Sequence, residues 1–273
     1  AEFTWILQDS NSPMHELLPE GDQCVLFPRR SLQEMAKLRS LPIGAPEVVM
    51  HEWLSHLTSV KFDWALNLGH DKTSGYILSQ VQADRKTGLE WDGKSWKSLD
   101  NEWLKYLNNH FSSGLKSEFH YVDVLLRMAD IPFTPPKAQK NKSKTILLQP
   151  FTSDSKKNWS MPNWVQLQKW ITDNTDFKAV VVGAFFEETE LLKSFAAEDI
   201  WLGGLGDLQT LVRTAALVVA GDTGIIHMAA LAGIPTLTMS LGSSDPVKTS
   251  AFGQGHFVLS TTSECRPCGH NDT

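Results

Sequence analysis

Three side chains that could bind a phosphorylated ligand, Asp222, Thr223 and His227, fall within one short stretch of the sequence. They follow an apolar run at 217–220 and precede a helix-favouring segment, so the turn at 221–224 is expected to join a buried strand to a helix. Free amides and the positive end of the dipole favour a phosphate group at a helix start. His227 lies four residues after Thr223, on the same helix face. The turn therefore predicts an anion site at the end of a strand.

Each of these residues also has an ordinary structural interpretation. A Gly-Asp-Thr-Gly turn can simply connect a strand to a helix, with Asp222 or Thr223 as its cap. His227 can be a surface histidine. Taken singly, such interpretations are at least as good as a ligand site, but the convergence of an acid, a hydroxyl and an imidazole between glycines favours the ligand site.

A second polar loop follows the apolar run at 145–149. It contains Thr152, Ser153 and Lys157, whose hydroxyl and ammonium groups suit phosphate oxygens. The GxxxxGK[ST] spacing of a P-loop is missing, and a solvated loop is the alternative.

Glu187 follows a third apolar run, at 178–182. Its carboxylate could accept hydrogen bonds from ribose hydroxyls, or it could begin a helix, where the dipole favours an acid. Because the carboxyl ends of parallel strands meet at one edge of a sheet, the three strand ends would line one crevice.

Strand-length and helix-length patterns alternate along the chain, which is typical of an α/β protein. The segment 130–145 contains three prolines and a basic run with little to bury, so we predict a linker there and domains at 1–135 and 136–273. Two parallel sheets flanked by helices, with a cleft between the domains, are expected. The expected strands are 3–7, 23–27, 64–68, 145–149, 178–182, 217–220, 236–239 and 257–259, and the expected helices are 31–39, 72–81, 120–129, 163–173, 187–195 and 208–216.

Length and composition fit an ordinary globular protein of 273 residues. The sequence has no apolar run of about 18 residues, and its first seven residues are too short for a signal peptide and carry Glu2, so a cytoplasmic location is expected. A net charge of −6 argues against general nucleic-acid binding. Cys265 and Cys268 predict a reduced structural loop, with metal or redox use as the alternatives.

Several of these segments together resemble glycosyltransferase family nine, the lipopolysaccharide heptosyltransferases. The DTGxxHxAA core at 222–230 is the most specific element, supported by the segments 149–159, 183–187 and 242–246. The resemblance covers the second half well. It extends more loosely to the first half through the segments 62–68 and 85–88 and His120, and the loop of Cys265 and Cys268 is also similar.

The resemblance implies a GT-B architecture, in which two Rossmann-like domains face a cleft. The second domain would hold a nucleotide sugar and the first an acceptor. The implied activity is an inverting, metal-independent transfer of a heptose, or a similar sugar, from an ADP-sugar to a lipopolysaccharide core or related glycan. No cofactor is implied, Lys157 would replace the charge of a metal ion, and peripheral contact with the inner face of the bacterial inner membrane would follow. The implied donor-binding residues are Thr152, Ser153, Lys157, Glu187, Asp222, Thr223, Gly224 and His227, and the acceptor-side residues are His70, Lys72 and His120.

The chain departs from the family pattern at both ends. Family members begin with a strand and a Gly-Asp turn whose aspartate is the expected general base, and here that base would lie upstream of Ala1. The catalytic residue therefore stays unknown, the first domain is expected to be incomplete, and a fragment is favoured over a degenerate transferase. A noncatalytic nucleotide-sugar-binding module is the alternative function. A dinucleotide oxidoreductase is disfavoured because no GxGxxG follows a strand, and the glycine-rich stretch 203–206 has no clear strand before it.

Overall fold

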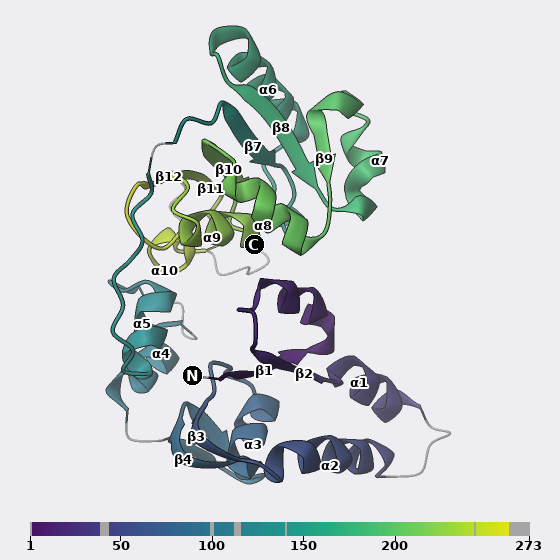
Figure 1. The fold of residues 1–273 in the computed structure, drawn as a ribbon, viewed down its shortest axis with the longest axis vertical. Helices are drawn as coiled ribbons and strands as arrows, with labels where there is room; N and C mark the ends of the chain where they lie inside the picture. The colour runs from purple at the N-terminus through teal and green to yellow at the C-terminus, as the bar shows by residue number, and fades with distance from the viewer. Residues whose placement is uncertain are drawn as a thin grey trace. The chain divides into compact units, whose positions relative to one another are not determined.

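The computed structural model describes residues 2–38, 44–98, 101–111, 116–139, 141–242 and 244–261, which form two compact units (Figure 1). The first unit comprises residues 1–106 and 125–131, and the second comprises 107–124 and 132–273. The chain thus enters the second unit, returns to the first for one helical segment and crosses again near residue 132. The predicted join between residues 135 and 136 lies close to the last crossing. Cys265 and Cys268 lie outside the described residues.

The second unit is built on a six-stranded parallel sheet with the order β12-β11-β10-β7-β8-β9. In chain order this is the 3-2-1-4-5-6 arrangement of dinucleotide-binding folds, and the order reverses between β7 and β10. Ligands of such sheets bind outside the carboxyl ends of the strands at that reversal. The strands are β7 (Thr145–Gln149), β8 (Lys178–Gly183), β9 (Ile200–Leu202), β10 (Leu217–Gly221), β11 (Thr236–Ser240) and β12 (His256–Ser260).

Both faces of this sheet are covered, as a parallel sheet requires. Successive residues of β7 point to opposite faces: Leu147 belongs to the core that contains Ile226 of α9, whereas Leu148 belongs to the core that contains Trp164 of α6. All four side chains are almost fully buried. The helices are α6 (Met161–Asn174), α7 (Glu188–Leu191), α8 (Leu205–Arg213), α9 (Gly224–Leu231) and α10 (Pro246–Thr249).

Three expectations about the second unit were wrong in detail. A strand, β9, does precede the glycine-rich stretch 203–206, and its three residues are too few to show a periodic pattern. The helix expected at 187–195 has only four α-helical residues, and a 3₁₀ turn (Phe185–Glu187) precedes it. The segment 130–145 is not all free linker, because the amide of Gln139 donates to the Gly233 carbonyl and the amide of Ala138 donates to the Gln254 carbonyl, both at 2.8 Å.

The first unit contains strands in pairs. β1 (Thr4–Gln8) pairs in parallel with β2 (Gln23–Phe27), β3 (Lys61–Leu66) pairs in parallel with β4 (Gln82–Thr87), and β5 (Leu89–Trp91) forms a hairpin with β6 (Trp96–Ser98). Among the described strands, β1 and β3 each bond to one neighbour, so the expected continuous sheet is represented by two separate pairs. The helices that begin in this unit or border it are η1 (Asp9–Leu17), α1 (Arg29–Lys37), α2 (Ala45–Thr58), α3 (Lys72–Gln80), α4 (Glu102–Phe111) and α5 (Tyr121–Met128).

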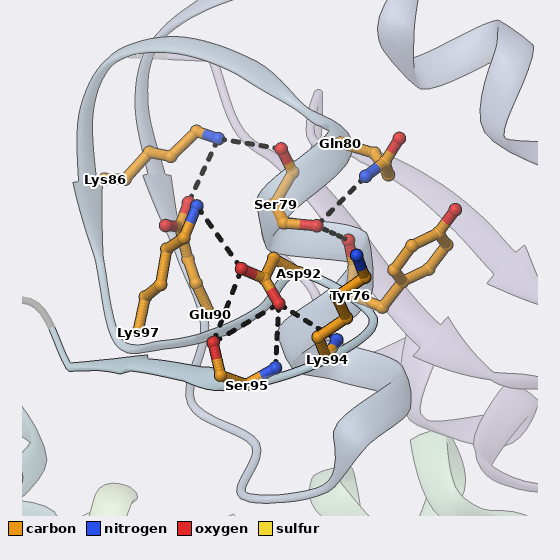
Figure 2. Close-up of polar contacts among 9 residues, drawn as sticks. All are labelled: Tyr76, Ser79, Gln80, Lys86, Glu90, Asp92, Lys94, Ser95 and Lys97. Carbon is orange, nitrogen blue, oxygen red and sulfur yellow. Dashed lines mark hydrogen bonds and ion pairs between the residues drawn. The ribbon is translucent and has the colours of Figure 1, made fainter.

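The β5–β6 hairpin has a turn closed by Asp92 (Figure 2). Its carboxylate accepts hydrogen bonds from the backbone amides of Ser95, at 2.8 Å, and Lys94, at 2.9 Å. These two bonds hold the pKa of Asp92 below its usual value, because they stabilise the ionised carboxylate.

Strand β4 and the same hairpin both contact α3. Lys86 donates to the carbonyl of Ser79 near the end of α3, at 3.2 Å, and forms an ion pair with Glu90 at 3.1 Å (Figure 2). A Cβ at Gly75 would lie 2.9 Å from the Trp96 ring, so glycine permits the close approach of helix and hairpin. None of the helices in the described ranges is both long and apolar enough to cross a membrane.

Candidate functional site

The turn after β10 and the loop after β7 lie against each other where the strand order reverses. Ala220 is the register partner of Gln149, so the two strands end side by side. A Cβ at Gly221 would lie only 2.7 Å from Cγ2 of Thr152. Glycine at this position therefore allows the turn to approach the loop closely.

The loop after β7 is shaped by its own polar groups. The Thr152 amide donates to Oδ1 of Asn158, and the Thr152 hydroxyl donates to the Asp154 carbonyl, both at 2.8 Å. The amide of Lys157 donates to the same Asp154 carbonyl at 2.9 Å. The loop is thus folded back on itself, with Ser153 exposed on it and the side chain of Lys157 largely buried.

Asp222 joins three segments of the second unit. Its Oδ2 accepts hydrogen bonds from Ser244 Oγ at 2.7 Å and Thr249 Oγ1 at 3.1 Å. The same oxygen lies 3.8 Å from Lys157 Nζ, and the side chains of this ion pair are 15% and 17% exposed. At such exposure water screens the charges less than at the surface, so the attraction between them is stronger than that of a surface ion pair.

The start of α9 is open beside this ion pair. Thr223 occupies the N-cap position with extended backbone angles, and within the described residues its side chain makes no cap hydrogen bond. The expectation that the side chain of Asp222 or Thr223 caps the helix was therefore wrong, and Asp222 is bound by Ser244 and Thr249 instead. Gly224 is exposed, and among the described residues no atom outside the neighbouring backbone lies within 4 Å of where its Cβ would be. An anion could reach this helix start.

Two histidines lie close to Asp222. Burial lowers the pKa of His227 below the usual 6.5, and the Asp222 charge opposes this shift. Burial likewise lowers the pKa of His120; the hydrogen bond to the Ser250 carbonyl opposes the shift, and the charge of His227 adds to it. Both imidazoles are therefore neutral at pH 7. His120 belongs to the second unit.

Glu187 has a local partner. Its Oε2 accepts a hydrogen bond from the Ala184 amide at 2.7 Å and so closes the 3₁₀ turn that follows β8. The structural alternative was an acid favoured by the dipole of a helix start, and here the carboxylate accepts a backbone hydrogen bond as well. The predicted contact with ribose stays a prediction. Phe185 and Phe186, beside it, are 68% and 86% exposed.

With this geometry in view, comparison with known proteins identifies the family. The family model for glycosyltransferase family 9 (heptosyltransferase) matches residues 50–273, which include Asp222 and its partners. The chain belongs to glycosyltransferase family 9. It is therefore a glycosyltransferase, as the resemblance implied. No curated protein sequence matches it closely enough to count as a relative.

Solved structures of a family 9 glycosyltransferase and of two heptosyltransferases share the fold at low sequence identity. The glycosyltransferase family 9 protein of Veillonella parvula DSM 2008 has a TM-score of 0.67 and 13% identity, covering 94% of this chain and 76% of its own. The E. coli heptosyltransferase WaaC with ADP has a TM-score of 0.66 and 14% identity. The match covers 98% of this chain and 88% of WaaC. The E. coli ADP-heptose lipopolysaccharide heptosyltransferase II has a TM-score of 0.55 and 14% identity. The match covers 96% of this chain and 82% of that enzyme. The predicted α/β GT-B fold class is confirmed.

The residues predicted on the acceptor side of this family 9 chain lie in different units. Lys72 begins α3 in the first unit, and its ammonium lies 4.6 Å from the centre of the Trp91 ring. It lines an open groove of about 760 Å³ together with Arg29 and His51. His70 is exposed just before α3, whereas His120 lies in the second unit.

Sequence reasoning missed Ser244 and Thr249, the two hydroxyl donors to Asp222. The signal was present, because Ser244 follows β11 and the rule of polar groups after parallel strands applies to it equally. Thr249 has no such signal, since only the fold brings α10 to the turn at Asp222. Within the part of the chain that the structure describes, no three His, Cys, Asp or Glu side chains could together hold a metal ion, and the expectation of a metal-independent site stays a prediction.

Proposed function

We propose that this family 9 glycosyltransferase binds an ADP-sugar where β7 and β10 end and transfers a heptose, or a similar sugar, to a lipopolysaccharide core or related glycan. The observation that carries the proposal is the largely buried ion pair of Lys157 and Asp222 beside the open start of α9. The donor is proposed from the similar structures of WaaC with ADP and of an ADP-heptose heptosyltransferase.

The charges of the site suit a diphosphate leaving group. Lys157 would neutralise phosphate oxygens, and the first amides of α9 would stabilise the charge that grows on the nucleoside diphosphate as the glycosidic bond breaks. Positive charge supplied in this way is why the proposed reaction is metal-independent. The Asp222 carboxylate can accept hydrogen bonds from sugar hydroxyls through its remaining lone pairs.

Transfer with inversion also needs a base that takes the proton of the acceptor hydroxyl. We assign no described residue to that role. The groove beside Lys72 offers a cationic and aromatic surface for the acceptor. An acceptor of the lipopolysaccharide type would bring the protein to the inner face of the inner membrane, and peripheral contact there is part of the proposal.

Titration calorimetry with ADP, UDP and GDP tests the donor. We expect ADP to bind most tightly, and failure of all three nucleotides to bind would contradict the proposal. Transfer is tested separately by following ADP release from ADP-heptose in the presence of a lipopolysaccharide core that lacks heptose. ADP binding without any transfer would instead favour the noncatalytic binding module.

A further inference from the structure

The segment that supplies hydroxyl donors to Asp222 is itself held by residues from a distant part of the second unit. Thr249 and Ser250 are adjacent, and the Ser250 carbonyl accepts a hydrogen bond from His120 Nε2 at 2.8 Å. Lys248 is 7% exposed, and its Nζ donates to the His110 carbonyl at 2.7 Å. Two neighbouring points of the segment 244–250 are thus tied to residues 110–120.

The hydrogen bonds of His120 fix its tautomer. The Val122 amide donates to Nδ1 at 3.1 Å, so Nδ1 must be the unprotonated nitrogen and Nε2 must carry the proton. That proton points to the Ser250 carbonyl. The ring stacks on Phe252, with ring centres 4.8 Å apart and planes 24° apart. Only the neutral Nε2–H imidazole satisfies both bonds.

We propose that His120 is a positioning residue for the Asp222 carboxylate: by holding the Ser250 carbonyl it fixes the segment from which Thr249 and Ser244 donate to Asp222. The inference rests on the proposed function, because it concerns the same donor site. His120 would not touch the sugar nucleotide. It would determine whether the Asp222 carboxylate is held in place before the donor arrives, so its loss would weaken donor binding.

The same geometry makes the arrangement sensitive to acid. A proton on Nδ1 would face the Val122 N–H, and that repulsion would displace the ring that also holds the Ser250 carbonyl. The charged and titratable groups that act on His120 include Asp123 on α5, His227 on α9 and Asp222 in the turn before α9, while the segment 244–250 provides the Ser250 carbonyl. A protonated His227 would further oppose a charge on His120, and the two acids would favour it.

Two substitutions separate this role from a merely structural one. His120 precedes α5, and its bond from Val122 caps that helix. His120→Asn keeps a good cap acceptor but is too short to reach Ser250. His120→Gln keeps an N–H that reaches Ser250 but caps the helix less well. His256→Gln is the matched control, because His256 is also partly buried and bonded to a hydroxyl, Thr236 Oγ1, on another part of the sheet.

Calorimetry with ADP-heptose at pH 7.5 is the measurement. We expect His120→Asn to bind about tenfold more weakly, as the loss of a partly buried hydrogen bond would produce. His120→Gln and His256→Gln should bind ADP-heptose within about twofold of the unaltered chain, even if the substitutions lower the melting temperature. Between pH 7.5 and 5.5 the affinity of the unaltered chain should fall more than that of His120→Gln. Equal affinity of His120→Asn and the unaltered chain, or equal losses in the Asn and Gln variants, would overturn the inference.

Failure of the unaltered chain to bind any nucleotide would overturn the proposed function and not this inference. In that case, hydrogen exchange of the backbone amides in residues 244–250 tests whether His120 holds this segment. We expect faster exchange in His120→Asn and near-normal exchange in His120→Gln. Unchanged exchange in His120→Asn would show that His120 does not hold the segment.

Discussion

Asp222 and Glu187 are acids that follow two strands of the same sheet, yet the fold uses them differently. Asp222 follows β10, and its partners Lys157, Ser244 and Thr249 come from two other segments. Glu187 follows β8, and its carboxylate closes its own turn through the Ala184 amide. The difference is position, because β10 lies beside β7 where the strand order reverses and β8 lies one strand beyond. An acid at that point meets side chains from several loops.

The largest effect is expected from Asp222→Ala. The substitution leaves Ser244 and Thr249 without their common acceptor and Lys157 without its counter-ion, so we expect ADP-heptose to bind about 100-fold more weakly, or about 2.7 kcal/mol. Calorimetry measures the affinity, and a cooperative thermal transition confirms that the variant is folded. Unchanged affinity would show that Asp222 does not contribute to donor binding. The proposed difference between Asp222 and Glu187 would then be wrong.

Lys157→Met should have the next largest effect. Methionine keeps much of the side-chain volume but removes the charge proposed to face the diphosphate, and we expect ADP to bind about 10- to 30-fold more weakly. Lys169→Met is the control, since Lys169 is 75% exposed on α6 and pairs with Asp173 of the same helix. Equal losses in both variants would indicate a general effect of net charge.

Substitutions at Glu187 should be milder and should separate its two possible roles. Glu187→Ala removes the bond from Ala184 and should lower the free energy of unfolding by about 1 kcal/mol, as the loss of a cap does. Glu187→Gln keeps an acceptor for that amide, so its unfolding curve in urea should be nearly unchanged. If Glu187 also contacts ribose, the Gln variant should bind ADP about fivefold more weakly. Normal ADP affinity in the Gln variant would show that Glu187 caps its own turn and does not contact ribose.

The smallest effect is expected from mild acid, because the histidines concerned are only partly buried. The pKa values of His120, His227 and His256 are lowered from 6.5 chiefly by burial. Above pH 6.5 both folded and unfolded states keep these rings neutral. As the pH falls through 6.5, the unfolded state takes up protons that the folded state does not, so the free energy of unfolding should fall. Urea unfolding at pH 7.5 and 5.5 measures this, and His227→Gln should reduce the dependence. A free energy of unfolding that does not change between pH 7.5 and 5.5 would contradict the lowered pKa values of these histidines.

Long apolar strands were the most predictable part of the fold. β7 has the predicted bounds, and β10 and β11 each extend one residue beyond them, because their runs are bounded by glycine, proline or polar residues. β9 and α2 were not predicted. Three residues give no period for β9, and α2 includes the pair Val48 and Val49, whose β-branched side chains obscure the helical signal.

For the site, the sequence by itself determined which loops carry polar groups that suit a sugar nucleotide, since Asp222, Lys157 and Glu187 follow apolar strands and this pattern is local. Tertiary structure alone decided which of them act together. The strand order places β10 against β7, Gly221 allows the turn to touch Thr152, and α10 brings Thr249 to Asp222. These contacts join residues far apart in the chain, and their geometry depends on the packing of the whole sheet, which no local pattern encodes.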